Sequence, residues 1–457
     1  MLRKLSQYIV EFKSGFRTKG SFAQNFAISF SGTALAQVLG FIFTPFIARI
    51  YGPEIYGLFA LFVSITNNIA PVATLQFPSG FVAAKGEAEF HNLIRITFLV
   101  LVFFTALIFL LTYFFKTPIL NFFNANALIP FAFIIPVYIF FMGLDQILLG
   151  WNIRRKEFKR GAIGKIFSVI TSKGLTVLWG IIAGPVPLGM IIGNLLIYPF
   201  ESLIKLNRSI RKELRLFLNW PSLQSIKATL INFRIYPYYV TTGMIINNLS
   251  NQLPVYYFSV AFNQSIVGYF ALASSLVMMP ISIVVTSSTT VFLQKAAEVY
   301  QQQPEQLKGI VNLLYNRLFW LSLVPLVFFA LLSEWAFVVI FGEEWKQAGV
   351  FASFLAMGAI FSVPANPLAV LFRIMHHERD NFFINLIFIG VKFVGLLWGI
   401  INENILFSVI GFSIAMMMGY ATQIFWLFGM VRLERAILIR DLVIVSLLFC
   451  LIVFIKL

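Results

Sequence analysis

Charged side chains are scarce in this sequence. Only 11% of its 457 residues are Asp, Glu, Lys or Arg, whereas 59% are hydrophobic. A water-soluble domain carries about a quarter charged residues, so the composition excludes a soluble globular protein. Cysteine is nearly absent as well. Cys450 is the single one, which excludes a disulfide framework and a cysteine-based metal site.

Residues that carry catalysis are also few. The three histidines, His91, His376 and His377, fall at the ends of apolar stretches, and the adjacent pair lacks the spacing of metal ligands on a helix. The sequence contains no phosphate-binding glycine loop and no polar stretch long enough for a nucleotide-sugar-binding domain. We therefore predict that the protein is not an enzyme and has no metal or cofactor.

Long apolar stretches make up most of the chain instead. Each is about the length that a helix needs to cross a bilayer, which predicts an all-α polytopic membrane protein. Twelve spans and a thirteenth are expected at residues 22–50, 55–84, 92–115, 127–150, 160–183, 186–205, 229–258, 266–293, 310–333, 347–373, 381–402, 405–430 and 438–456.

The basic residues test this helix count. When the loops are assigned alternately to the two sides, 27 of the 34 Lys and Arg residues fall on the side of the N-terminus and four on the other. Basic residues collect in cytoplasmic loops, so the N-terminus is predicted to be cytoplasmic. The net charge of +16 therefore does not require a nucleic-acid partner. The apolar stretch that follows the N-terminus is long enough to span, unlike that of a cleavable signal.

The two halves of the chain resemble each other. A shift of 211 places residues 57–87 on 268–298 with seven identical positions out of 31. A shift of 219 then brings Lys173 onto Lys392, and LWGII (178–182) onto LWGII (397–401). Each repeat holds six helices, an even number, so both run in the same direction through the membrane. Such parallel repeats predict two six-helix bundles around a central cavity, with the last helix outside the repeat.

This organisation predicts five segments. They are a cytoplasmic amphipathic arm (1–21), an N-terminal six-helix bundle (22–205), a basic cytoplasmic linker (206–228), a C-terminal six-helix bundle (229–430) and an extra C-terminal helix (431–457).

Lys173 and Lys392 are the first candidate site residues. Lys173 lies about 13 residues inside its span, roughly 20 Å at 1.5 Å per residue, and Lys392 lies at a similar depth. A charge at that depth costs about 2.5–3.5 kcal/mol on insertion scales and tends to face a polar interior. Two such lysines, one from each half, suit an anionic substrate such as a phosphate head group. Pairing with an acid or a backbone carbonyl is the alternative.

Three other charged residues have less certain roles. Asp145 and Lys165 are expected at one depth on consecutive helices, which favours a structural ion pair, with an ion-coupling site as the alternative. Arg49 ends the first span on the outer side. It serves either as a snorkelling terminus or as an outer-gate cation, and the sequence does not distinguish between the two.

Amide side chains cluster in the first, second and seventh spans. We expect most of them to join helices and keep Asn67 and Asn68 as candidates for contacts with sugar hydroxyls. The set is Asn25, Gln37, Asn67, Asn68, Gln76, Asn247, Asn248, Asn251 and Gln252.

Three motifs carry a resemblance to a known family. They are FTPFIARIYGPEIYGLFAL (43–61), WNIRRKEFKRGAIGKIFSVITSKG (151–174) and FGEEWKQAG (341–349). In this order they resemble the polysaccharide-exporting (Wzx-type) flippases of the multidrug/oligosaccharidyl-lipid/polysaccharide superfamily. The resemblance implies two six-helix bundles around a cation-lined cavity, for which Lys173, Lys392 and Arg49 are the matching positions. One departure is the count of thirteen helices, since family members usually have twelve or fourteen.

The resemblance also implies a function. The substrate would be an undecaprenyl-pyrophosphate-linked oligosaccharide, moved across the bacterial cytoplasmic membrane by alternating access with a proton or sodium gradient as the driving force. Polysaccharide polymerase and glycosyltransferases would be neighbouring partners. The first alternative is a drug or metabolite exporter of the same superfamily, which should have acids rather than lysines in its cavity. The second is a membrane-embedded glycosyltransferase or polymerase, which the short outer loops disfavour.

Overall fold

The computed structural model of the chain describes residues 22–206, 210 and 223–457. Within these ranges it describes every side chain except those of residues 22–30 and 223. The predicted arm (1–21) and most of the predicted linker (206–228) lie outside these ranges. Every regular element within them is a helix, so the predicted all-α class is confirmed. Long apolar helices satisfy their own backbone hydrogen bonds, which is what a bilayer requires of a spanning segment.

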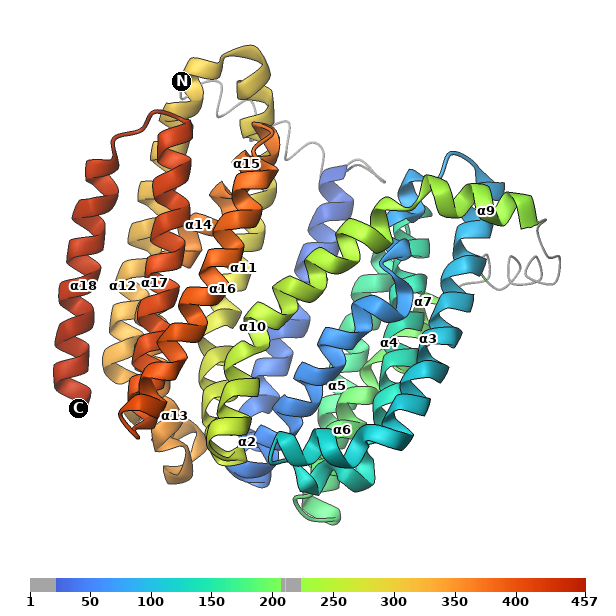
Figure 1. The fold of residues 1–457 in the computed structure, drawn as a ribbon, viewed down its shortest axis with the longest axis horizontal. Coiled ribbons are helices and arrows are strands. Elements are labelled where there is room, and N and C mark those ends of the chain that lie inside the picture. The colour runs from blue at the N-terminus through green and yellow to red at the C-terminus, as the bar shows by residue number, and fades with distance from the viewer. Residues whose placement is uncertain (1–21, 207–209, 211–222) are drawn as a thin grey trace. The chain divides into compact units, whose positions relative to one another are not determined.

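Figure 1 labels the helices, and in chain order they have the following bounds: α2 (Phe22–Thr74), η1 (Phe77–Ala83), α3 (Glu87–Phe122), η2 (Asn126–Phe131), α4 (Ile134–Arg154), α5 (Phe158–Ile182), α6 (Pro187–Leu195), α7 (Ile197–Lys205), α9 (Leu223–Asn232), η4 (Tyr236–Thr241), α10 (Thr242–Ala261), α11 (Gln264–Gln302), η5 (Pro304–Gln306), α12 (Leu307–Phe341), η6 (Glu343–Trp345), α13 (Lys346–Ala359), α14 (Ser362–Leu368), α15 (Val370–Ile374), α16 (Glu378–Ile401), α17 (Ile405–Met430) and α18 (Arg435–Lys456).

Ten helices of the described chain are long and apolar enough to cross a membrane. A pair bent by 43°, Glu343–Ala359 and Ser362–Ile374, raises the number to eleven. The protein is therefore a multi-pass membrane protein. The final helix, α18, is among the ten and is one of the two most hydrophobic.

The prediction of thirteen spans exceeds this count, and two helices account for the difference. α2 has 53 residues, about twice what a bilayer needs, and contains Gly52 at φ 68° and ψ 173°. A residue without a Cβ tolerates this conformation, so α2 bends there and holds the first two predicted spans. α10 occupies the seventh predicted range. Its four amide side chains, between Asn247 and Gln252, make α10 too polar to be counted among the ten helices that are apolar enough to cross a membrane.

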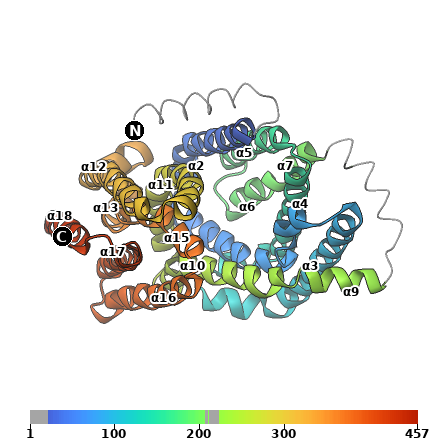
Figure 2. The ribbon, with the colours of Figure 1, turned by 90° about the horizontal axis from the view of Figure 1, so that it is seen from above.

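Two compact units divide the chain, residues Met1–Gln252 and Leu253–Leu457. In unit 1, α4 packs against α2, α3 and α7, while α5 packs along α2 and α7 (Figure 2). α9 contacts α3 in the same unit.

The centre of unit 2 is α13. Every residue from Ala348 to Ala359 in this helix is buried, because α11, α12 and α17 all pack around it. α18 contacts α12, α13 and α17 and lies at the edge of its unit in Figure 2.

One turn geometry occurs in both units. Lys156 and His376, separated by 220 positions, both have a left-handed conformation, with φ values of 58° and 59°. In each turn the next N–H reaches five residues back, from Glu157 to the Asn152 oxygen (2.8 Å) and from His377 to the Phe372 oxygen (2.6 Å). The same turn geometry thus precedes α5 in unit 1 and α16 in unit 2.

Candidate functional site

Lys173 lies on α5 and is half-buried. Among the described residues, its ammonium group has no ion-pair or hydrogen-bond partner. The alternative of a paired lysine therefore finds no support in this part of the chain. A buried cation without an acid is costly in hydrocarbon, and such groups usually serve a pathway rather than packing.

Lys392 lies on α16 and is only 5% exposed. Its Nζ atom is 4.2 Å from the centre of the Phe388 ring, one helical turn earlier. The Phe388 ring in turn meets Tyr420 of α17 edge to face. A desolvated ammonium over an aromatic face is stabilised by the ring quadrupole. Unit 2 therefore holds this lysine in an aromatic setting.

The amide candidates join α2 to α10 within unit 1. Asn248 Nδ2 donates to the backbone oxygen of Asn67 (2.8 Å), and Ser64 Oγ donates to Gln252 Oε1 (2.7 Å). Asn68 Nδ2 donates to the Ser64 oxygen on its own helix (3.0 Å). The first two bonds are helix-joining contacts of the kind expected of most of the amides, whereas the Asn68 bond stays within α2. The side chain of Asn67 is half-buried and stays a candidate.

Arg49 is exposed on α2, three residues before the bend at Gly52. This position agrees with either of its two predicted roles, a terminus that reaches the membrane surface or a gate cation.

The partner predicted for Asp145 requires correction. Its carboxylate bonds Lys205 rather than Lys165, with Lys205 Nζ 2.7 Å from Oδ1 and 2.8 Å from Oδ2. Lys165 is exposed on α5. Gly164, the residue before Lys165, is the one that faces α7 near Glu201. Depth along the helices suggested Lys165, but the rotation of α5 points that side chain away.

Glu201 completes a buried charged cluster with Asp145 and Lys205. Lys205 Nζ donates to Glu201 Oε2 (2.8 Å), and Ser202 Oγ contacts Asp145 Oδ1 (3.4 Å). All three ionisable side chains are buried, at 6% exposure for Asp145, 7% for Glu201 and 2% for Lys205. We name these three residues the charged triad. It connects the middle of α4 to the last turns of α7.

Further polar groups lie beside the charged triad in unit 1. The hydroxyl of Tyr138 on α4 donates to the Asn194 side-chain oxygen and lies 3.4 Å from the hydroxyl of Tyr198. Tyr198 is one turn before Glu201 on α7 and lies within electrostatic range of both triad carboxylates. Tyr138, Tyr198 and the triad thus make one buried polar region.

Sequence reasoning missed Glu201 and Lys205. Lys205 was counted among the cytoplasmic loop charges because it ends an apolar stretch. A signal was present, since Glu201 and Lys205 have the i, i+4 spacing of a helical ion pair and Asp145 is expected at the same end of the bundle. The missing information was which helix packs against α4.

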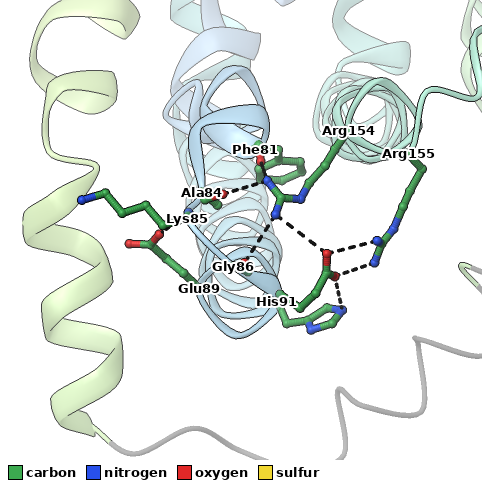
Figure 3. A network of polar contacts seen from close by, with 9 residues as sticks. Phe81, Ala84, Lys85, Gly86, Glu89, His91, Arg154 and Arg155 are labelled. Atoms are coloured by element: carbon green, nitrogen blue, oxygen red, sulfur yellow. Dashed lines mark hydrogen bonds and ion pairs between the residues drawn. The ribbon is translucent and has the colours of Figure 1, made fainter.

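A second network of charges lies where α4 ends (Figure 3). Arg154 donates to the backbone oxygens of Phe81 and Ala84 (both 2.9 Å). Arg155 makes two bonds to the Glu87 carboxylate (3.1 and 2.6 Å), and His91 lies 4.0 Å from that carboxylate. The two arginines join the end of α4 to η1 and to the start of α3.

A third site links α9 to α3. Glu89 accepts a hydrogen bond from the Lys85 backbone N–H (2.7 Å) and one from Asn232 of α9 (3.0 Å). Asn92 Nδ2 donates to Ser225 Oγ (2.7 Å). The end of the predicted linker (206–228) thus belongs to α9, which is anchored to α3 of the same unit.

Solved structures of transporters share this fold. A lipid II flippase MurJ in an inward-closed conformation is 17% identical, with a TM-score of 0.68 over 93% of this chain and 91% of that one. An inward-facing multidrug resistance MATE transporter of the MOP superfamily is 14% identical, with a TM-score of 0.61 over 88% and 94%. An outward-facing MATE transporter is 15% identical, with a TM-score of 0.55 over 89% and 95%. At these identities the likeness concerns the fold.

Sequence comparison supplies the family. No curated protein sequence matches the chain significantly. The sequence profile of the family described as polysaccharide biosynthesis protein matches residues 46–349, about two thirds of the chain. This range includes the kink of α2 at Gly52, the charged triad and Lys173, and it extends into unit 2. The chain therefore belongs to the polysaccharide biosynthesis protein family.

Proposed function

We propose that this protein is a flippase for undecaprenyl-pyrophosphate-linked oligosaccharides. It moves the lipid-linked repeat unit from the inner to the outer leaflet of the bacterial cytoplasmic membrane, with its own N-terminus in the cytoplasm. Membership of the polysaccharide biosynthesis family supports the pathway. The fold shared with a lipid II flippase supports a lipid-linked substrate.

The observation that carries the proposal is the pair of repeat-related lysines. Lys173 in unit 1 has no acidic partner among the described residues, and Lys392 in unit 2 is 5% exposed against an aromatic ring. Two cations inside membrane helices fit the pyrophosphate of such a substrate. An ammonium group binds phosphate as a compact charge, so it can hold and release the head group without a fixed bidentate geometry.

Alternating access supplies the movement in this proposal. The chain contains bends suited to it, at Gly52 in α2 and between Glu343–Ala359 and Ser362–Ile374. Discontinuous membrane helices often line the binding sites of transporters with repeated halves. A proton or sodium gradient drives the cycle, and no cofactor takes part. Polysaccharide polymerase and glycosyltransferases act before and after the transport step.

The second candidate is a cation-coupled drug or metabolite exporter. The fold shared with the MATE transporters favours it. The position of the lysines favours the flippase, because organic cations would be repelled by Lys173 and Lys392. Substrate charge therefore separates the two candidates.

The test is polysaccharide production in a deletion strain without a redundant transporter. The strain is complemented with wild type, Lys173→Ala, Lys392→Ala or the double variant, and the polymer is normalised to membrane protein level. Each single variant should reduce export, and the double variant should reduce it further. Lys→Arg variants should keep part of the activity because the charge remains. Lys165→Ala, which removes an exposed lysine from α5, is the matched control and should export normally.

The position of the lipid-linked intermediate completes the test. Accumulation of repeat units on the cytoplasmic face of the deletion strain supports a flippase. Normal polymer from the double variant would contradict a role of the two lysines in transport but would not contradict the flippase function. Normal polymer from the uncomplemented deletion strain would favour the exporter.

A further inference from the structure

The charged triad contains more acid than base. Asp145 and Glu201 are two carboxylates, and Lys205 is the single ammonium group that both of them bond. With both acids ionised the triad has a net charge of −1, and its three side chains are all at least nine-tenths buried. An uncompensated charge in such a setting is expensive, whereas two neighbouring carboxylates can share one proton. The composition of the triad therefore suits a site that gains and loses a proton.

Titratable groups around Asp145 come from one neighbouring helix. Glu201 and Lys205 act on it directly from α7, and Tyr198 lies nearby on the same helix. α2, α3 and α5 also pack near α4. Among the described residues, they add no charged group that acts on Asp145. The state of the triad is thus decided by its own three members, without a fourth charge to balance the second acid.

The charged triad has no counterpart in the second repeat. The shift of 219 that places Lys173 on Lys392 takes Asp145, Glu201 and Lys205 to Pro364, Tyr420 and Ile424. None of these residues is charged. The buried charges are therefore a feature of unit 1 alone.

The geometry of the triad suits a proton better than a metal cation. The Nζ atom of Lys205 already occupies the point where Asp145 Oδ1, Asp145 Oδ2 and Glu201 Oε2 converge, at 2.7, 2.8 and 2.8 Å. A sodium ion at that point would have to displace the ammonium group. The described residues also contain no cluster of His, Cys, Asp and Glu suited to a metal.

We propose that the charged triad is a proton-binding site of unit 1, in which Asp145 and Glu201 share one exchangeable proton. Uptake makes the triad neutral, with one carboxyl protonated and the other paired with Lys205. Release restores two carboxylates on a single ammonium group and draws α4 and α7 together through it. α7 follows a break after Leu195, so this short helix can respond to the change. The link to substrate movement rests on the proposed flippase function, while the site itself does not.

The test is proton uptake by the purified full-length protein in detergent. An unbuffered sample is taken from about pH 8 to about pH 5, a range into which burial moves the titration of carboxyl groups, and the bound protons are counted with a pH indicator. Glu201→Gln is the main variant, because it leaves the Asp145–Lys205 pair neutral and should fold. Wild type should bind about one proton more than Glu201→Gln. Infrared difference spectra should show a protonated carboxyl band in wild type that both Glu201→Gln and Asp145→Asn lose.

Asp441→Asn is the matched control. Asp441 is fully buried in unit 2 but is paired one to one with Arg440, so its removal should leave proton uptake and the infrared band unchanged. Equal uptake by wild type and Glu201→Gln, with the band retained, would overturn the site. Loss of the band in Asp441→Asn would overturn it too.

Cell export separates this inference from the proposed function. Loss of uptake in Glu201→Gln together with normal polymer from the deletion strain would keep the proton site and refute the flippase. If Glu201→Gln binds as many protons as wild type and the deletion strain loses its polymer, the proton site is refuted and the flippase function is kept.

Discussion

Gly395 of α16 and Gly411 of α17 face each other so closely that a Cβ atom on either would collide with the backbone oxygen of the other. This crossing brings two membrane helices into backbone contact, which only small residues allow. Gly395→Ala and Gly411→Ala should each lower the stability of the protein by about 1–3 kcal/mol, the usual cost of overpacking. Thermal unfolding of the purified protein in detergent measures the effect.

Gly390 provides the control on the same helix. A Cβ atom there meets nothing within 4 Å. Gly390→Ala should leave stability unchanged or raise it by about 0.5–1 kcal/mol, because alanine favours the helix. A loss at Gly390 equal to that at Gly395 would contradict the close crossing as the cause.

The contact between Lys392 and Phe388 makes a second prediction. Phe388→Leu keeps an apolar side chain against Tyr420 but removes the ring face beneath the ammonium group. A double-mutant cycle of Phe388→Leu with Lys392→Met should give a coupling of about 0.5–2 kcal/mol in thermal unfolding. A coupling near zero would mean that the ring is only a packing partner.

The network at the end of α4 predicts unequal roles for its members. Arg154 donates to two backbone oxygens and lies over the Phe90 ring, with its side chain 15% exposed. Arg154→Ala should therefore cost about 1.5–3 kcal/mol. Glu87 is 54% exposed, and Glu87→Gln should cost less than about 1 kcal/mol because solvent screens its ion pairs. Chemical denaturation of both variants compares them, and equal losses would contradict this ranking.

The attachment of α18 gives a fourth prediction. Asp441 is fully buried and accepts a hydrogen bond from Tyr315 of α12 (3.0 Å), while Lys456 at the other end of α18 bonds Glu334 of α12 (2.8 Å). Asp441→Ala should lower stability by about 1–3 kcal/mol, since it strands a buried hydroxyl.

Lys456→Ala is the comparison for α18. Its partner Glu334 is 29% exposed, so the loss should stay below about 1 kcal/mol. Thermal unfolding of the two variants should separate them clearly. A larger loss for Lys456→Ala would place the main anchor of α18 at its other end.

Hydrophobic pattern alone predicted most of the fold. The expected spans fall on helices of the structure, ten of which are long and apolar enough to cross a membrane among the described residues. The repeat seen in LWGII and the two lysines stays a prediction. Span length depends on bilayer thickness and hydropathy, both of which are local properties of the chain. For the same reason the sequence did not show that the first two spans form one kinked helix at Gly52.

The sequence by itself determined that the protein crosses the membrane many times. It also predicted that the halves are related and that one helix of each half contains a deep lysine. Only the tertiary structure decided that Asp145 pairs with Lys205, that Glu201 joins them, and that Lys392 rests on Phe388. Sequence spacing gives the depth of a residue along its helix. The rotation of a helix, and the choice of the helix that packs against it, depend on the shape of all the side chains together.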